Sequence, residues 1–182
     1  ILNVLEDVIP VKKRDVKESI SLLTKTKKKI SSTNLTNSNP ALSLAKWISG
    51  FPIIYYPWGL HSAAIRFKNS LQENAKTHTF VEDIIESSHN AIVAWEKRSK
   101  IKPILIIGKD DYTKTKKRWQ VVKEFFELNK IQYKEVHSSN GSILTKLVNL
   151  IYLLDYSSIY LAVLSKTNPT PVKPIEFIKS RI

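Results

Sequence analysis

The chain has 182 residues, of which 42% are hydrophobic and 25% are charged. This size and composition fit one well-filled domain, or one domain with an arm, of an ordinary globular protein. Cysteine is absent, which excludes disulfides, thiolate catalysis and cysteine metal sites. Methionine is absent too, so we expect Ile1 not to be the natural start and the chain to be the C-terminal part of a longer protein.

The chain carries 29 Lys and Arg against 16 Asp and Glu, a formal net charge of +13. Such a surplus is compatible with nucleic acid, an acidic membrane or small anionic substrates as partners. The basic runs Lys12–Arg14, Lys25–Lys29 and Lys114–Arg118 lie on amphipathic helical stretches and match no nucleic-acid motif. We interpret them as solvated surface and expect no nucleic-acid partner; the competing hypothesis of nucleic-acid binding rests on the charge alone.

The longest apolar stretch, Ile143–Leu164, is interrupted by Lys146, Asn149, Asp155 and Ser157. These polar residues predict a buried helix rather than a membrane span, so no membrane partner is expected. The N-terminus lacks the basic, apolar and small-residue pattern of a signal peptide, which favours a cytoplasmic location.

The first predicted element is a helix over Asp15–Ile30, where apolar residues recur at helical spacing. Residues 31–38 are polar turn formers and predict a linker or flexible loop. We therefore expect residues 1–38 to form an interdomain linker with a helical arm, and residues 39–182 to form the compact domain.

The compact part begins with Asn39-Pro40, an Asn cap followed by Pro at the first helical position, and this helix is expected to stop at Gly50. Three short apolar runs predict buried strands: Pro52–Tyr56, Pro103–Ile107 and Ile131–Val136. The expected helices are His61–Ala75, Phe80–Glu96, Thr115–Asn129, Ser142–Ser165 and Ile175–Ile182. Strands that alternate with helices predict an α/β three-layer αβα sandwich around a parallel sheet.

Ligands of open parallel sheets bind at the carboxyl ends of the strands. Three segments follow predicted strands there: Tyr56–Gly59, Gly108–Asp111 and Ser138–Ser142. The last leads into a helix N-terminus, whose free N–H groups favour anions. An ordinary Asn-Gly turn is the alternative interpretation of this segment.

Metal chemistry is not expected, because no two of the four histidines have the helical spacing of a metal site and no HExxH motif occurs. Acid–base chemistry remains. On the predicted helix 61–75, one polar face carries Arg66, Asn69 or Ser70, and Glu73 at three- and four-residue steps. Glu73 lies near the helix end, a position that suits a general base. The alternative is an exposed Glu73 paired with Lys76 or Arg66.

His89 lies near the apolar face of its segment, four residues after Ile85 and three before Ile92. A buried structural histidine is the alternative to a catalytic one. Lys179 lies beside Ile178 on the predicted terminal helix, where the alternative is a surface lysine whose stem covers apolar surface.

Several segments together resemble the archaeal and bacterial bifunctional phosphoglucose/phosphomannose isomerases. Phe67–Lys76 resembles that family's catalytic glutamate segment, and Ser88–Glu96 (SHNAIVAWE) its histidine segment NHNEIVGWE. Segments from Asn140 to Ala162 are similar to its long helix, and Asn168–Lys179 to its C-terminal signature. The likeness runs in order over residues 39–182.

The resemblance implies a SIS-type, flavodoxin-like domain, two such domains per subunit and a homodimer. It implies aldose–ketose isomerisation of hexose 6-phosphates through a cis-enediol, without metal or organic cofactor. Glu73 would be the catalytic base, while His89 and Lys179 would assist ring opening, with His89 reaching into the neighbouring subunit's site. Thr170 and Arg66 are the candidate substrate-binding residues; Val172 is the alternative to Thr170 for the hydroxyl position on which mannose activity depends.

Departures from the family pattern keep a second hypothesis open. Gln72, Ala91 and Ala94 replace the usual Asn, Glu and Gly. Nothing before Asn39 resembles the phosphate-binding Ser/Thr loop, so we expect a separate N-terminal SIS domain as partner. The alternative function is a non-catalytic SIS-like module that binds sugar phosphates or regulates.

Overall fold

The computed structural model describes residues 9–182 and is built around a parallel sheet. Its four strands follow the order β2-β1-β3-β4. They span Phe51–Tyr56 (β1), Phe80–Asp83 (β2), Ile101–Ile107 (β3) and Lys134–His137 (β4). The α/β class with a parallel sheet, predicted from the alternation of strands and helices, is confirmed.

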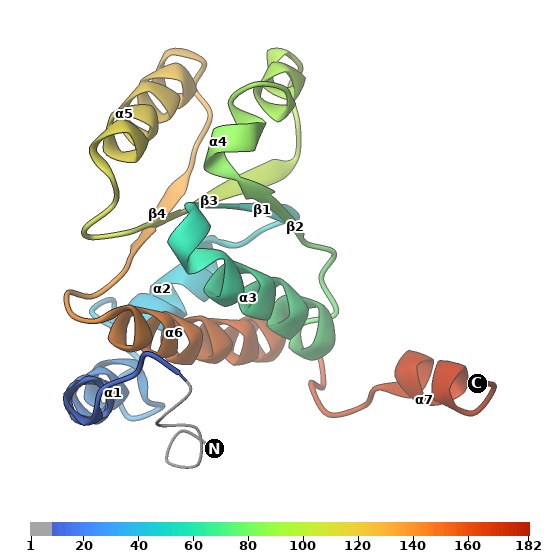
Figure 1. The fold of residues 1–182 in the computed structure, drawn as a ribbon. Helices are drawn as coiled ribbons and strands as arrows, with labels where there is room; N and C mark the ends of the chain where they lie inside the picture. Colours follow the sequence, from blue (N-terminus) through green and yellow to red (C-terminus); the bar gives the residue numbers. More distant parts are fainter. Residues whose placement is uncertain (1–8) are drawn as a thin grey trace.

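Helices cover both faces of this sheet (Figure 1). One face carries α2 (Pro40–Trp47), α3 (His61–Asn74) and α6 (Ile143–Leu164). The other carries α4 (Ile84–Ser87), η2 (Ala91–Glu96) and α5 (Thr113–Leu128). The short η1 (Trp58–Leu60) leads from β1 into α3, and α7 (Lys173–Lys179) follows α6.

The central strands β1 and β3 are buried on both sides because successive residues of a strand point to opposite faces. Ile54, Ile104 and Ile106 belong to the core beneath α2, α3 and α6. Tyr55 and Leu105 belong to the core beneath α4 and α5. This explains why both strands are nearly continuous apolar runs in the sequence.

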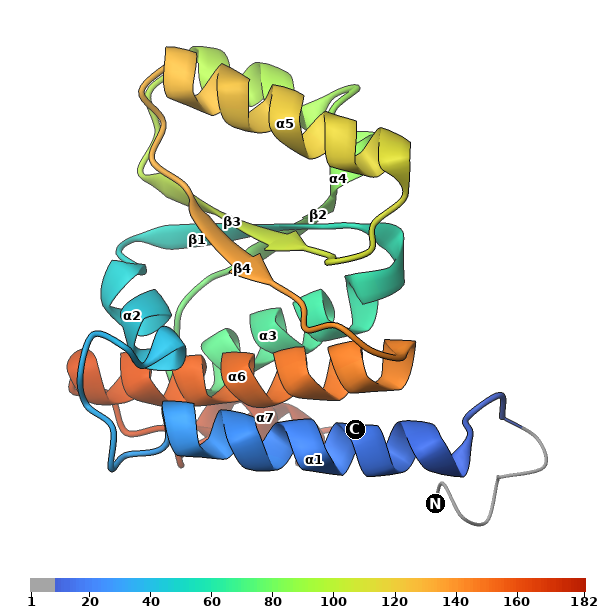
Figure 2. The ribbon, with the colours of Figure 1, turned by 90° about the vertical axis from the view of Figure 1, so that its left-hand side faces the viewer.

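Helix α1 (Lys13–Ile30) lies along the outer side of α6 as a further layer (Figure 2). Polar bonds join the two helices along their length: Ser19 Oγ with Thr145 Oγ1 at 3.0 Å, Asn149 Nδ2 with Thr26 Oγ1 at 2.7 Å, and Tyr160 Oη with the Ile30 carbonyl at 2.7 Å. The expected arm is therefore in contact with the compact domain. The boundary at residue 39 stays a prediction, and residues 1–8 lie outside the described part.

A carboxylate from α1 caps the N-terminus of α6. Glu18 Oε2 accepts hydrogen bonds from the Ser142 backbone N–H at 3.0 Å and from Thr145 Oγ1 at 2.8 Å. These bonds, with the backbone bond first, lower the pKa of Glu18. Gly141 has φ +110°, and a Cβ there would stand 2.7 Å from the same carboxylate. The anion position expected at residues 138–142 is thus filled by the chain itself.

The loop after β3 is also closed by its own bonds. Asp111 Oδ2 accepts from the Gly108 N–H at 2.9 Å and from Trp119 Nε1 at 3.0 Å. The Lys109 N–H donates to Ser138 Oγ at 2.9 Å, which ties this loop to the one after β4. Two of the three segments expected to bind ligands are therefore held by internal hydrogen bonds.

The predicted helix Phe80–Glu96 is wrong: the segment folds as β2, α4 and η2. Phe80 pairs in register with Ile53 of β1. Residues 80–83 therefore form a parallel strand beside β1 instead of the first turn of the predicted helix. Asp83 then caps α4 by accepting from the Ile85 N–H at 2.7 Å, and α4 ends after four residues. The predicted strand Ile131–Val136 is found, shifted to β4.

By length and composition alone, α6 could cross a bilayer. In the fold it packs against α1, α2 and α3, and Leu150, Leu154 and Ala162 are almost fully buried. The core helix of a globular domain meets the same criteria, and the packing agrees with the predicted buried helix.

The Glu18 cap leads to a prediction about stability. In the folded protein the pKa of Glu18 lies below its ordinary value of 4.5. The ionised cap therefore stabilises the fold above that pH, and this stabilisation is lost as the pH falls. We expect Glu18→Gln to lower the thermal unfolding temperature at pH 7, and the difference from wild type to shrink below about pH 4. Thermal unfolding followed by circular dichroism measures both.

Glu124→Gln, a change at an exposed residue of α5, is the matched control and should leave the unfolding temperature unchanged. Two results would contradict the role of the cap. One is an equal drop in unfolding temperature in both variants. The other is a difference between Glu18→Gln and wild type that stays constant as the pH falls well below the ordinary pKa of a glutamate.

Candidate active site

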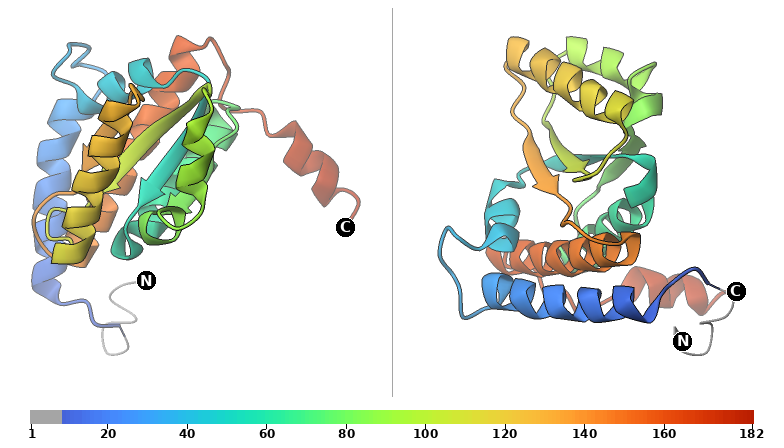
Figure 3. Two further views of the ribbon diagram at one scale, coloured as in Figure 1. Left: turned by 90° about the horizontal axis from the view of Figure 1, so that it is seen from above. Right: turned by 60° about the vertical axis from the view of Figure 1, so that its left-hand side comes forward.

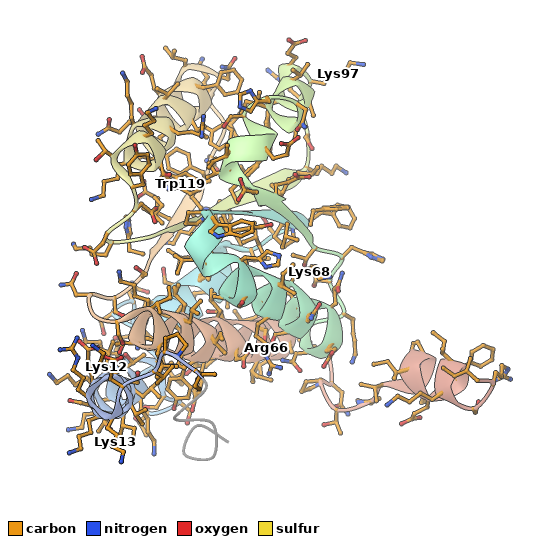
Figure 4. The ribbon with its side chains drawn as sticks, in the orientation of Figure 1. Lys12, Lys13, Arg66, Lys68, Lys97 and Trp119 are labelled. Atoms are coloured by element: carbon orange, nitrogen blue, oxygen red, sulfur yellow. The ribbon has the colours of Figure 1, made fainter. Side chains whose placement is uncertain are left out.

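A polar seam joins α3 to α6 and contains one of the predicted substrate-binding residues, Arg66 (Figure 4). Its guanidinium forms a bidentate ion pair with the Asp155 carboxylate, with Nε 3.2 Å from Oδ1 and Nη2 3.0 Å from Oδ2. Ser70 Oγ donates to Asp155 Oδ1 at 2.5 Å. The hydrogen bond and charge of Asp155 raise the pKa of Arg66. Arg66 is thus held on this surface in an ion pair with Asp155.

The seam continues toward the C-terminal end of α3. Asn74 Nδ2 donates to Ser158 Oγ at 2.8 Å, and Ser158 Oγ donates to the Asp155 carbonyl at 2.7 Å. Glu73, next to Asn74, is exposed, and its carboxylate has no hydrogen bond or ion pair within residues 9–182. Its charge adds a smaller contribution to the raised pKa of Arg66, so the two groups interact electrostatically. Glu73 is therefore accessible to solvent.

Lys76 connects the end of α3 to the segment that carries Thr170. It adopts φ 54° just after the helix. Its ammonium donates to the Glu73 carbonyl at 2.5 Å and to the Pro171 carbonyl at 2.7 Å, with the Pro169 carbonyl at 3.4 Å. A cation at a helix C-terminus also complements the helix dipole. This tether places the exposed Thr170 segment beside the last turn of α3, which carries Glu73.

His89 lies on the opposite side of the sheet from Glu73. It follows α4, which packs on the α5 face, whereas α3 packs on the α6 face. The imidazole is exposed, so the alternative of a buried structural histidine is wrong. The His89 backbone N–H donates to the Glu86 carbonyl at 2.9 Å. The fold of one chain does not bring His89 to Glu73.

Lys179 is also remote from Glu73. It ends α7, a helix that stands away from the body of the domain (Figure 3). Every residue of α7 is exposed, including the apolar Ile175, Phe177 and Ile178. Of the five predicted site residues, the structure thus gathers Arg66, Glu73 and the Thr170 segment, and leaves His89 and Lys179 apart.

No pattern in the sequence indicated that Lys76 binds the 169–171 segment. Spacing along α3 suggested a side-chain pair with Glu73, but the ammonium binds the Glu73 backbone carbonyl instead. Its other partners lie more than ninety residues away, and contacts across that separation leave no local pattern. Among residues 9–182, no group of three or more His, Cys, Asp and Glu side chains is placed to hold a metal.

The two interactions of Asp155, one with Ser70 and one with Arg66, should differ in strength. The Ser70 hydroxyl is buried, whereas 58% of the Arg66 side chain is exposed. In double-mutant cycles with Asp155→Asn, we expect a coupling of roughly 1.5–3 kcal/mol with Ser70→Ala, because a hydrogen bond to a charged group is strong. The coupling with Arg66→Ala should be about 0.2–1 kcal/mol, since solvent screens the pair.

Urea unfolding of the four variants in each cycle measures these coupling energies. A coupling of Arg66 equal to or greater than that of Ser70 would contradict the ranking. Lys68→Ala, on the same helix but not bonded to Asp155, serves as the control.

Residues 37–182 match the family model described as the bacterial phospho-glucose isomerase C-terminal SIS domain. The chain is similar to the bifunctional phosphoglucose/phosphomannose isomerase of Caldicellulosiruptor bescii, with 31% identity over 146 residues, 78% of this chain and 43% of that protein. The same named enzyme of Aquifex aeolicus is 30% identical over 144 residues, 76% of this chain and 45% of that protein. The chain thus spans less than half of either relative.

The fold is similar to a crystal structure of a glucose-6-phosphate isomerase like protein from Thermus thermophilus. The TM-score is 0.71 at 16% sequence identity, and the match covers 92% of this chain and 56% of that one. At this identity the likeness concerns the fold alone, and it agrees with the SIS-type architecture expected from the sequence.

Proposed function

Because the chain belongs to the family of bacterial phosphoglucose isomerase C-terminal SIS domains, we propose that it supplies the acid–base half of a hexose 6-phosphate isomerase. The proposed reaction interconverts glucose 6-phosphate and fructose 6-phosphate, and mannose 6-phosphate as a further substrate. The observation that carries this proposal is the free Glu73 carboxylate at the end of α3, beside the tethered Thr170 segment.

Glu73 would act as the base. In the open-chain aldose, its carboxylate takes the proton from C2 as the carbonyl at C1 gains a proton, which yields a cis-enediol. Return of the proton from Glu73 to C1 and loss of the O2 proton give the ketose. A positioned carboxylate suffices for such a transfer next to a carbonyl. Arg66, held by Asp155, would serve as a substrate-binding group rather than as the base.

The remaining groups of the site would come from outside this fold. His89 lies across the sheet from Glu73, which favours its use in the site of a second subunit of a homodimer. The exposed neighbours Ile175 and Ile178 of α7 favour docking of this helix on an N-terminal SIS domain of the same protein. That docking would bring Lys179 to the sugar, and the N-terminal domain would hold the phosphate.

Replacement of Glu73 by Gln tests the base directly. The amide keeps the shape of the side chain but cannot accept the proton, so kcat for fructose 6-phosphate should fall by about 10²–10⁴-fold in the full-length protein. A coupled assay that detects glucose 6-phosphate, without added metal, measures it. Glu124→Gln is the control with the same change of charge.

Undiminished turnover in Glu73→Gln would remove Glu73 as the base. A wild-type protein that is stabilised by sugar phosphates but turns over none would instead support the non-catalytic binding module. The two results separate the assignment of the residue from the assignment of the function.

Thr170 provides a second test, of sugar preference. If its hydroxyl binds the substrate near C2, Thr170→Val should lower kcat/KM for mannose 6-phosphate by roughly tenfold, with a smaller effect on glucose 6-phosphate. Val172→Thr is the matched variant two residues away. If Val172→Thr changed kcat/KM for mannose 6-phosphate selectively and Thr170→Val did not, residue 172 would be the substrate-binding position instead of Thr170.

A further inference from the structure

A cavity of about 470 Å³ lies on the α5 side of the sheet, where the chain enters β3 and β4. Its walls come from the segment that joins η2 to β3 and from the turn after α5. The lining includes Trp95, Glu96, Lys97, Arg98, Ser99, Ile101, Lys102, Asn129, Lys130, Ile131 and Gln132. We call it the amino-end pocket. Its volume falls in the range of small-molecule sites.

The amino-end pocket carries an excess of positive charge. Four lining residues are cationic and one, Glu96, is acidic. The Lys102 ammonium lies 5.5 Å from the ring centroid of Trp47 on α2, so Lys97, Arg98 and Lys130 against Glu96 leave two positive charges on the α5 side. In the described part of the chain none of the four cations forms an ion pair. The C-terminal end of α5 adds only about half a negative elementary charge. The potential in the pocket is therefore positive.

Concavity distinguishes this pocket from the basic run on α1. The lysine run on α1 is exposed on the convex outer side of the domain, where solvent screens each charge. Cations around a low-dielectric cavity instead focus their field on the space between them. Figure 4 shows Lys97 at the outer end of the layer formed by α5 and η2, far from Arg66.

The walls also offer apolar surface and hydrogen-bonding groups. Trp95, Ile101 and Ile131 are partly buried and provide a flat apolar side. The indole is held in place, since Nε1 donates to Tyr55 Oη at 3.0 Å and the ring meets Phe126 edge-on at 5.5 Å. A held aromatic ring beside several cations can accept an organic group that bears several negative charges.

We infer that the amino-end pocket binds a small polyanion of the polyphosphate class, such as a nucleoside triphosphate, at a site separate from Glu73. The pocket lies on the α5 face and Glu73 on the α6 face. Hexose 6-phosphates carry a single phosphate and belong, in the proposed function, to the surface of Glu73. This site therefore goes beyond the proposed isomerase function and does not depend on it.

Isothermal titration of the full-length protein at low ionic strength tests the site with ATP, tripolyphosphate and adenosine. ATP and tripolyphosphate should bind, with an affinity that falls as salt rises, and adenosine should not. Reversal of two wall charges, Lys97→Glu with Lys130→Glu, should weaken ATP binding by about tenfold or more. Lys27→Glu with Lys28→Glu on α1 makes the same change in net charge and should weaken it little.

The outcomes separate the source of the anion. Tighter binding of ATP than of tripolyphosphate identifies a nucleotide, and equal binding identifies inorganic polyphosphate; both support the site. If the charge-reversed protein does not fold, Lys97→Gln with Lys130→Gln replaces it. This pair should weaken ATP binding measurably, though by less than the charge reversal would. Glu73→Gln should retain ATP binding.

Three results would overturn the inference. The first is no binding of ATP or tripolyphosphate at low salt. The second is equal weakening in the pocket pair and the α1 pair, which would mean that net charge alone attracts the anion. The third is competitive displacement of ATP by fructose 6-phosphate, which would place the anion in the sugar-phosphate site.

Discussion

The polar side chains of α6 set how the helices on one side of the sheet align. Along an otherwise apolar helix, each is bonded to a different neighbour: Thr145 to Glu18 and Ser19, Asn149 to Thr26, Asp155 to Arg66 and Ser70, and Ser158 to Asn74. Polar groups in a packed interface must find partners, so a shift of either neighbouring helix would leave several unpaired. Hydrophobic packing holds α1 and α3 on α6, and these bonds determine their register.

The position of Glu73 follows from that register. Asp155 fixes the middle of α3 through Arg66 and Ser70, and Lys76 fixes its end against the 169–171 segment. The backbone at the end of α3 is thereby fixed, while the exposed Glu73 carboxylate forms no bond among the described residues. A site assembled from rigid helices of this kind can be completed by groups from a second domain and a second subunit.

The charged groups behind the net charge of +13 are unevenly distributed over the structure. Several acidic groups are engaged in structure: Glu18 caps α6, Asp111 closes the loop after β3, and Asp110 pairs with Lys146 at 2.7 Å. These carboxylates are therefore bonded within the fold, and the charge of Asp110 is paired with that of Lys146. The cations around the amino-end pocket form no ion pair among the described residues, so a part of the surplus lies at this concave place. Net charge alone conveys nothing about this distribution.

Local sequence determined a large part of this fold. The Asn39-Pro40 cap, the apolar runs of β1 and β3 and the helical spacing of α3 and α5 need only neighbouring residues to be read. The motif around Glu73 likewise singled out the proposed base. Segment 80–96 was misread because β2 is an edge strand that exists through its pairing with β1. Which face of the sheet carries each following helix was decided by tertiary packing, and this packing separates His89 from Glu73. Lys179 lies apart for another reason, because α7 stands away from the body of the domain.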